Sequence, residues 1–267
     1  MDDLISTERL AAELQHVCVI DATLFLPDAG RDARAEHEAG HIPGAVFLDL
    51  SAFADVPEPA RFAEAMGALG VGERNPIVVY DDSPLHSAAR AWWLLRSFGA
   101  RSVALLDGGL AKWKAEGRPL ESGTGGRRTA SFAGKADLSR LARMADVRDA
   151  GDTQIVDARS PGRFTGAEPE PRPGIAPGHI PGSRNLPQGK LFAADGTWKR
   201  GDELRAAFTA AGVDVDKPMV TTCGSGVTAA VLSFGAHLLG ARDVRLYDGS
   251  WAEWGADAST PKAVGAA

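Results

Sequence analysis

Short apolar runs alternate with longer amphipathic stretches along the whole chain. Runs that are apolar on both faces and too short for helices are typical of strands in a parallel sheet that helices cover. Such runs fall at residues 17–21, 77–80, 103–106, 154–157, 219–222 and 244–247. The pattern predicts an α/β fold with open, mainly parallel sheets, in which ligands bind beyond the carboxyl ends of the strands.

Two stretches between these runs carry apolar residues with the period of a helix. Residues 88–98 and 227–239 each place apolar side chains at positions i, i+3, i+4 and i+7. Each stretch is followed by a glycine, Gly99 or Gly240. Glycine commonly ends a helix because it adopts the left-handed conformation without strain. We therefore predict two helices that end at these glycines.

The chain also repeats itself. The sequence HIPGA from His41 recurs as HIPGS from His179. VIDA at 19–22 is followed later by IVDA at 155–158, and LDGG at 106–109 by YDGS at 247–250. Three blocks in one order indicate two copies of a unit of about 130 residues, too long a period for a solenoid. We predict domains at 1–122 and 139–267, joined by a linker at 123–138 that begins in a flexible, Gly-rich stretch.

Composition narrows the class of protein. With 267 residues, 44% of them apolar and 24% charged, the chain fits about two globular domains and not a disordered protein. The net charge of −6 argues against a nucleic-acid partner. The apolar runs fall short of the roughly 20 residues that span a bilayer, and Met1-Asp2-Asp3 does not begin a signal peptide. We expect a cytoplasmic protein without a membrane or nucleic-acid partner.

The two cysteines stand in different contexts. They lie far apart in the sequence, which suits a reducing cytosol better than a disulfide framework. Cys18 lies inside a strand, as a core residue would. Cys223 follows a strand and opens the loop Cys-Gly-Ser-Gly-Val-Thr before a helix. Inward N–H groups and a helix N-terminus favour the thiolate there, so we predict that Cys223 is a nucleophile. Because no Cys or His cluster has metal-ligand spacing, we expect no metal and no organic cofactor.

These blocks, taken together, resemble the tandem rhodanese-type sulfurtransferases, and the cysteine loop is similar to that of 3-mercaptopyruvate sulfurtransferases. The resemblance spans about Leu4 to Trp254. It implies two tandem rhodanese-like domains, of which the first is catalytically silent. Asp81 stands where the second copy has Cys223, and an aspartate cannot carry sulfane sulfur. The resemblance implies an enzyme that moves sulfur from 3-mercaptopyruvate, through a Cys223 persulfide, to a thiol, cyanide or a thioredoxin-like acceptor.

The resemblance implies further site residues. Arg163 and Arg172, in the pattern GRF…EPEPR, bind the donor's carboxylate and keto oxygen, as the planar guanidinium can. Glu168 and Glu170 brace these arginines. Ser225 helps to protonate the leaving enolate. The remaining substrate-binding positions are the loop residues whose backbone N–H groups hold the sulfur, namely Gly224, Gly226, Val227 and Thr228.

The first copy departs from the family pattern. Mercaptopyruvate members often place an Asp and a His from this copy near the loop serine as a proton relay, but this chain is short there, with Ser51 near the aspartate position. We hypothesise that His86 substitutes, because the ordinary pKa of histidine suits proton transfer near neutrality. His41 and His179 are expected to serve the Pro-Gly turns that follow them. Trp251 and Trp254 are expected to pack.

The residues of the same loop bear on other possible functions. A cysteine phosphatase needs an arginine where this chain has Ala229, so phosphatase activity is excluded. Thiosulfate-preferring relatives carry basic residues directly after the cysteine, whereas Gly224 and Ser225 are neutral and attract a dianion less. The alternatives are a thiosulfate:cyanide sulfurtransferase and a non-catalytic persulfide carrier or sensor. The two arginines argue against the carrier, which needs no carboxylate clamp.

Overall fold

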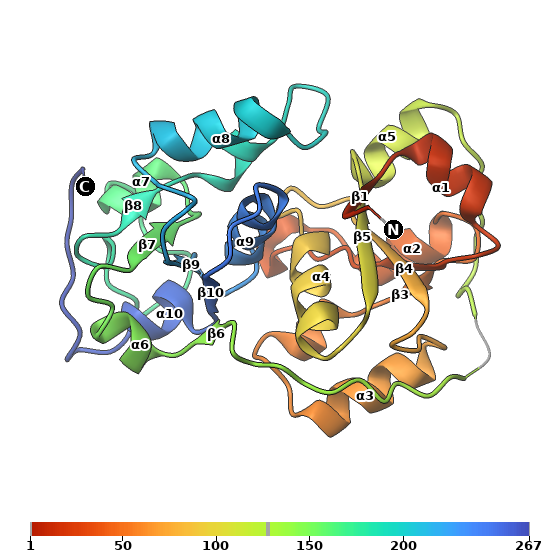
Figure 1. Ribbon diagram of the computed structural model, residues 1–267, viewed down its shortest axis with the longest axis horizontal. Helices are drawn as coiled ribbons and strands as arrows, with labels where there is room; N and C mark the ends of the chain where they lie inside the picture. The colour runs from red at the N-terminus through yellow and green to blue at the C-terminus, as the bar shows by residue number, and fades with distance from the viewer. Residues whose placement is uncertain (1, 127–128, 267) are drawn as a thin grey trace. The chain divides into compact units, whose positions relative to one another are not determined.

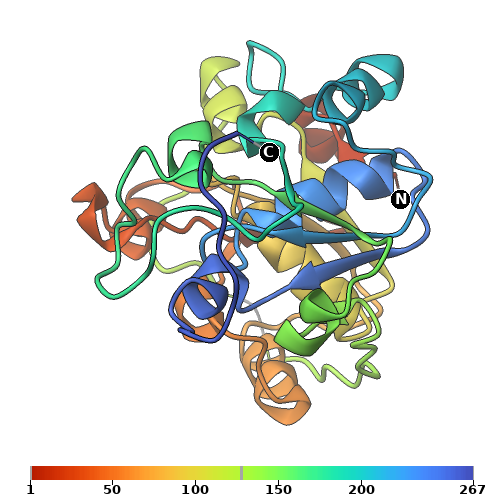
Figure 2. The same cartoon turned by 90° about the vertical axis from the view of Figure 1, so that its left-hand side faces the viewer.

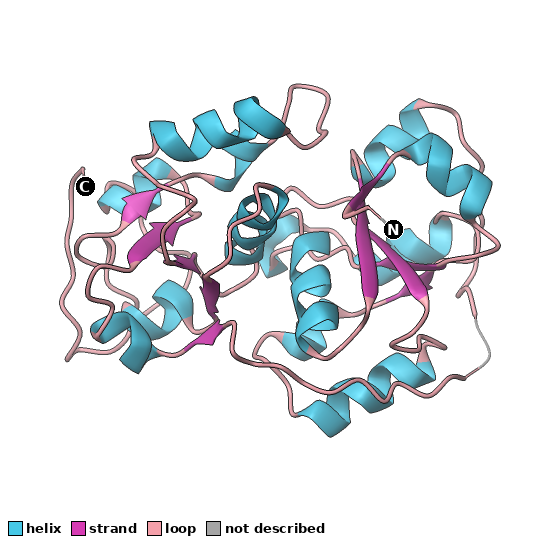
Figure 3. Cartoon of the chain, viewed as in Figure 1, coloured by secondary structure: helices cyan, strands magenta, loops and turns pink. Residues whose placement is uncertain are grey.

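Figure 1 shows the computed structural model, which describes residues 2–126 and 129–266. The chain divides into two compact units, the first made mainly of residues up to Leu138 and the second mainly of residues from Ser139 onward. Each unit contains one five-stranded sheet, and helices flank both sheets (Figure 3). All strand pairs of the two sheets are parallel. The predicted fold class is therefore confirmed.

The first unit alternates strands and helices. Its main elements in chain order are β1 (Leu4–Ile5), α1 (Thr7–Glu13), β2 (Cys18–Asp21), α2 (Ala33–Ala39), β3 (Val46–Phe47), α3 (Pro59–Ala68), β4 (Pro76–Tyr80), α4 (Ala88–Ser97), β5 (Ser102–Leu106) and α5 (Gly109–Ala115). The strand order in the sheet is β1-β5-β4-β2-β3. Short 3-10 helices at Pro27–Ala29 and Leu50–Phe53 lie in its loops.

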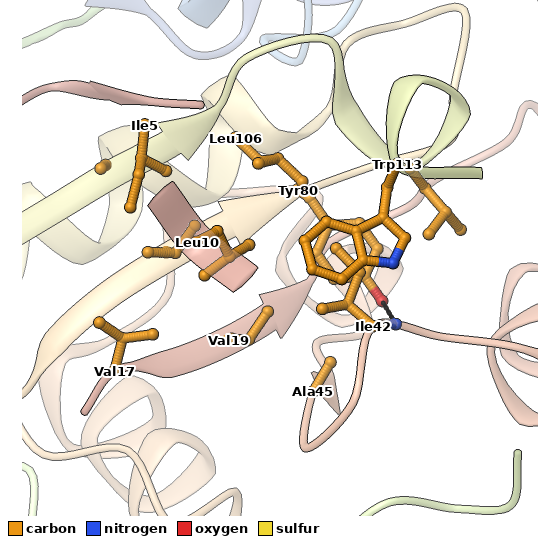
Figure 4. Close-up of a cluster of buried hydrophobic side chains, with 12 residues drawn as sticks. Ile5, Leu10, Val17, Val19, Ile42, Ala45, Tyr80, Leu106 and Trp113 are labelled. Atoms are coloured by element: carbon orange, nitrogen blue, oxygen red, sulfur yellow. Dashed lines mark hydrogen bonds between the residues drawn. The ribbon is translucent and has the colours of Figure 1, made fainter. Parts of the chain in front are cut away.

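The first sheet is buried on both faces. In β4, Ile77, Val78, Val79 and Tyr80 are all 0% exposed, although successive side chains point to opposite faces. One face packs with side chains from α1 and α5 in the cluster of Figure 4, where Trp113 is the largest member. On the other face, α4 packs against β4 and β5. Helices of this length are marginal alone, so their packing on the sheet stabilises them.

The second unit repeats this arrangement. Its main elements are β6 (Leu141–Ala142), α6 (Met144–Arg148), β7 (Gln154–Asp157), α7 (Pro161–Thr165), β8 (Arg184–Asn185), α8 (Gly201–Ala210), β9 (Met219–Thr222), α9 (Ala229–Leu238), β10 (Val244–Tyr247) and α10 (Ser250–Trp254). A 3-10 helix at Gln188–Leu191 precedes α8. The order β6-β10-β9-β7-β8 matches that of the first sheet, strand for strand.

The second core contains the predicted tryptophans. Trp251 and Trp254 are 1% and 2% exposed and pack with Val220 and Tyr247 on one face of the sheet. Helix α9, almost entirely buried, packs against β9 and β10. The expectation that both tryptophans pack is confirmed. These contacts fix β9 and α9, and with them the loop between the two elements that holds Cys223.

The two HIPG turns are held by the segments that follow α5 and α10. His41 forms an antiparallel bridge with Glu121, and His179 forms the same bridge with Ala263 in the C-terminal tail, which is dark blue in Figure 2. Each histidine is buried, and its ring Nδ1 lies within hydrogen-bond distance of a backbone carbonyl of its own unit, at 2.7 Å and 2.8 Å. The two histidines therefore serve the turns, as predicted.

The segment before the second unit is partly ordered against the first. Arg127 and Arg128, which lie in the predicted linker, are outside the described residues. Beyond them, the Ala130 N–H donates to the Gly67 carbonyl at 3.0 Å, and the Asp137 N–H donates to the Ser97 carbonyl at 2.7 Å. These bonds tie residues 130–137 to the first unit, so this part of the linker does not behave as a free chain.

Candidate active site

Cys223 lies at the carboxyl end of β9, on the loop that leads into α9. Its side chain is 2% exposed, and the cysteine is free. The loop is attached to the start of α10 by two backbone hydrogen bonds: Trp251 N–H donates to the Cys223 carbonyl and Ala252 N–H to the Gly224 carbonyl, both at 2.9 Å. The nucleophile predicted from the sequence is therefore held on a fixed loop at the sheet edge where ligands bind.

Ser250 stabilises this loop through hydrogen bonds of its side chain. Its hydroxyl accepts the N–H groups of Cys223 at 3.2 Å and Gly226 at 3.1 Å, and donates to the Tyr247 carbonyl at 2.7 Å. The same oxygen lies 3.9 Å from the Cys223 Sγ. Ser250 is fully buried with a φ of 51°, a conformation that is costly for any residue with a side chain. The three hydrogen bonds of the hydroxyl offset that cost.

Ser250 was not predicted as a site residue, because the YDGS block that contains it was used only as evidence of the repeat. A signal was present, because the first copy has Gly109 at the matching position and only the copy with the cysteine carries a hydroxyl. The residue after each of these positions makes an equivalent backbone hydrogen bond in its own unit. Leu110 N–H donates to the Asp81 carbonyl at 3.0 Å, just as Trp251 N–H donates to the Cys223 carbonyl. Asp81 is thus the structural counterpart of Cys223.

The loop leaves several N–H groups available. Those of Gly224, Ser225, Val227 and Thr228 donate to no protein acceptor among the residues that the structure describes. Gly226 was also expected to offer its N–H to the sulfur, but that N–H donates to the Ser250 hydroxyl. Gly226 has another role: its φ is 80°, and a Cβ there would lie 2.8 Å from the Asp248 carbonyl oxygen. Free N–H groups and the N-terminus of α9 favour negative charge beside this loop.

Arg163, on α7, reaches this loop. A Cβ added at Gly224 would lie 2.9 Å from Arg163 Nη2 and 3.6 Å from Nη1. The guanidinium thus lies against the residue that follows the nucleophile. Helix α7 begins after Ser160, whose hydroxyl accepts the Arg163 N–H at 3.4 Å, with Pro161 as its first residue. The structure therefore brings Arg163 and the cysteine loop together, as the carboxylate-binding role requires.

A buried pair, Arg159 and Glu170, lies behind Arg163. Glu170 Oε2 accepts from Arg163 Nη2 at 2.6 Å, and Glu170 Oε1 accepts from Arg159 Nη1 at 2.7 Å. The side chains of Arg159 and Glu170 are 1% and 3% exposed. Glu170 braces Arg163, as predicted, whereas Glu168 accepts from the Ser160 hydroxyl instead. Arg159 was missed, although an arginine just beyond the carboxyl end of β7 was a visible signal.

Two other predicted residues are more exposed. Ser225 is half-exposed, and its hydroxyl has no protein partner among the described residues. Arg172 is exposed in the loop between α7 and β8 and makes no ion pair within the described part of the chain. The structure does not bring Arg172 into contact with Arg163 or the cysteine loop. Its charge is therefore uncompensated, which leaves it able to bind an anion.

His86 belongs to the first unit, where it precedes α4 with a φ of 48°. Burial lowers the pKa of His86 from 6.5 to about 4. The hypothesis of a relay relied on an ordinary histidine pKa, and that premise is wrong, because a buried imidazole resists taking up a proton. Burial also raises the pKa of Asp81 to about 7, even though its carboxylate accepts the Ala88 N–H at 2.5 Å.

Two further properties of the described chain bear on the site. No group of three or more His, Cys, Asp or Glu side chains in it is arranged to hold a metal ion. Searched over the same residues, no helix combines the length and apolar character that crossing a membrane requires.

The chain is similar to known proteins over most of its length. The family model of the rhodanese-like domain matches residues 7–116 and 141–257. The 3-mercaptopyruvate sulfurtransferase of Homo sapiens is 44% identical over 94% of this chain and 91% of its own length. The thiosulfate sulfurtransferase of Cricetulus griseus is 38% identical over 94% and 91%. The crystal structure of SseA from Escherichia coli, a 3-mercaptopyruvate sulfotransferase by its description, is 38% identical, with a TM-score of 0.85 and coverage of 94% and 99%.

Proposed function

The chain belongs to the rhodanese family, and we propose that this sulfurtransferase takes sulfur from 3-mercaptopyruvate on Cys223 and passes it to an acceptor. The contact between Arg163 and Gly224 carries the proposal, because a carboxylate-binding group lies beside the residue next to the nucleophile. We assign catalysis to the second domain, residues 139–267. The first domain, residues 1–122, is silent because Asp81 stands where sulfur would be carried.

In the donor step, the Cys223 thiolate attacks the thiol sulfur of 3-mercaptopyruvate. A sulfur–sulfur bond forms, the carbon–sulfur bond breaks, and its electron pair leaves on the enolate of pyruvate. The enolate then takes up one proton, for which the half-exposed Ser225 hydroxyl is our candidate donor or relay. The carbon is reduced as sulfur is oxidised, so the step needs no external oxidant.

The loop and the arginines share the binding of the donor. The unpaired N–H groups of Gly224, Ser225, Val227 and Thr228 hold the transferred sulfur and its negative charge. Arg163 binds the carboxylate from its position against the loop, and Arg172, on its exposed loop, is our candidate hydrogen-bond donor to the keto oxygen. Orientation by such contacts contributes to rate because it holds the donor sulfur in line with the thiolate.

In the acceptor step, a nucleophile attacks the outer sulfur of the persulfide. The sulfur–sulfur bond breaks, its electron pair returns to Cys223 as thiolate, and the acceptor leaves with the sulfur. A small thiol, cyanide or the thiol of a thioredoxin-like protein can fill this role. Because donor and acceptor react in turn with one residue, the cycle is ping-pong.

The test is multiple-turnover sulfur transfer with 3-mercaptopyruvate and thiosulfate side by side, for the wild type and Cys223→Ser. We expect a higher kcat/KM with 3-mercaptopyruvate and no turnover in the variant. A preference for thiosulfate would leave the fold and the nucleophile in place and support the alternative donor. The absence of turnover with either donor would favour the persulfide carrier.

The alternative donor has one observation in its favour, namely the similarity to a thiosulfate sulfurtransferase. The neutral Gly224 and Ser225 weigh against it, since they supply no cation for a second negative charge. A cytosolic location suits the proposed chemistry, because the free Cys223 thiol must stay reduced between turnovers.

A further inference from the structure

Glu170 is shared by two arginines at the back of the proposed donor site. One carboxylate oxygen accepts from Arg159 Nη1 at 2.7 Å, and the other accepts from Arg163 Nη2 at 2.6 Å. Both oxygens are thus engaged while the side chain is 3% exposed. Charge-assisted hydrogen bonds to both oxygens offset the cost of burying a carboxylate.

Arg159 is the fixed member of this cluster. Its Nη2 donates to Asp157 Oδ2 at 2.7 Å and to the Gly178 carbonyl at 2.8 Å. The guanidinium carbon lies 4.7 Å from the ring centre of Trp251, whose backbone N–H donates to the Cys223 carbonyl. Arg159 therefore touches both halves of the site, through Glu170 on one side and Trp251 on the other.

The charges of this cluster cancel. Asp157 and Glu170 carry two negative charges, and Arg159 and Arg163 carry two positive charges. Arg163 is the member that remains partly exposed, at 27% of its side chain, and so faces the donor. It presents oriented N–H donors, but its charge is already balanced by Glu170. A donor with a second negative charge would find little extra attraction there.

We propose that Glu170, held by Arg159, determines donor specificity by balancing the charge of Arg163, so that the site selects donors with one negative charge over donors with two. The inference rests on the proposed function, since it assigns the donor to Arg163. Glu170 acts as a specificity residue through Arg163, and Arg159 is a positioning residue that keeps Glu170 in place.

The test is single-turnover loading of Cys223 by 3-mercaptopyruvate and by thiosulfate, read as the mass gained by the chain over time. Glu170→Gln removes one negative charge and keeps an acceptor for the arginines. We expect the ratio of the loading rate constants, thiosulfate over 3-mercaptopyruvate, to rise about tenfold, because a dianion gains twice the attraction of a monoanion. An unchanged ratio would overturn the proposal.

Two further variants separate charge from structure. Glu168→Gln makes the same change at an exposed carboxylate that accepts from the Ser160 hydroxyl and not from Arg159 or Arg163, and we expect its ratio to match the wild type. Arg159→Lys keeps the charge but loses the planar fork that holds Glu170. We expect it to raise the half-saturating concentrations of both donors about tenfold, since both bind at Arg163, without moving the ratio. If the ratio in Arg159→Lys shifted as much as in Glu170→Gln, a displaced Glu170 side chain would explain both results. That outcome would overturn the charge account.

Failure of the proposed function gives a different result. If wild-type Cys223 gains no sulfur from 3-mercaptopyruvate, the proposed function fails before any variant is compared. If the wild type loads and the Glu170→Gln ratio stays constant, only the specificity role fails. Thermal melting of each variant and of the wild type identifies any loss of loading that comes from unfolding. Unfolding lowers loading by both donors equally and leaves the ratio of their rate constants unchanged.

Discussion

The guanidinium of Arg163 packs directly on the backbone of Gly224, so that a Cβ at residue 224 would lie 2.9 Å from Nη2. The absence of a side chain at residue 224 therefore matters for the site. It leaves the space in which a cation from α7 can lie one residue from the nucleophile. A side chain at this position would compete with Arg163 for the same space.

Gly224→Ala tests this relationship. The new Cβ meets only the end of a flexible side chain, so the protein should fold with a loss of less than about 1 kcal/mol in stability. The displaced guanidinium should lower kcat/KM for 3-mercaptopyruvate about tenfold. Gly189→Ala is the matched control, because a Cβ there meets nothing within 4 Å. Equal activity of the two variants would contradict the role assigned to the contact.

Ser250 offers a second test, on stability and loading together. Ser250→Ala leaves the N–H groups of Cys223 and Gly226 without their acceptor, and we expect a loss of about 1–3 kcal/mol with slower loading of Cys223. Ser250→Gly loses the same acceptor but relieves the positive φ, so it should be about 1 kcal/mol more stable than the alanine variant. Urea unfolding and loading rates measure both effects. An alanine variant as stable as the wild type would contradict this account.

Asp81 should make stability fall with pH. Burial raises its pKa from 3.8 to about 7, so between these values the folded protein keeps a proton that the unfolded chain has lost. The stabilisation is complete below the unfolded pKa and is lost as pH rises through the folded one. Asp81→Asn removes this titration, and the stability of the variant relative to the wild type should rise across the window, by up to about 1.4 kcal/mol per pH unit. A relative stability that does not change with pH would contradict the raised pKa of Asp81.

His86 should contribute in the opposite direction. Its pKa is lowered from 6.5 to about 4, so between these values the unfolded chain binds a proton that the folded protein excludes. Its contribution to stability is present above the unfolded pKa and is lost as pH falls through the window. Because the imidazole is neutral throughout the neutral range, His86→Ala should leave the pH profile of turnover unchanged above about pH 5. A shifted profile would restore the proton-relay hypothesis.

The sequence predicts the fold well where its pattern is strong. The central strands follow the apolar runs, and β7, β9 and β10 have the predicted bounds. The two-residue edge strands β1, β3, β6 and β8 were not predicted, since two residues show no period. The helix predicted from residue 227 begins at Ala229 because the preceding residues are needed for the cysteine loop.

The candidate site was predictable to the extent that local motifs describe it. Cys223 and Arg163 were found because each lies in a distinctive motif, and the structure brings them to one loop. Ser250 and Arg159 were missed because their roles depend on contacts between segments far apart in sequence. The low pKa of His86 could not be read from the sequence either, since it arises from burial in the folded protein.

The central claim is that Cys223 carries the sulfur taken from 3-mercaptopyruvate. The most direct measurement is the mass of the intact chain after reaction with this donor alone, together with the pyruvate released, for the wild type, Cys223→Ser and Cys18→Ser. The account predicts one sulfur atom and one pyruvate for each chain in the wild type and in Cys18→Ser, and neither in Cys223→Ser. Sulfur retained by Cys223→Ser, or none gained by the wild type, would contradict it.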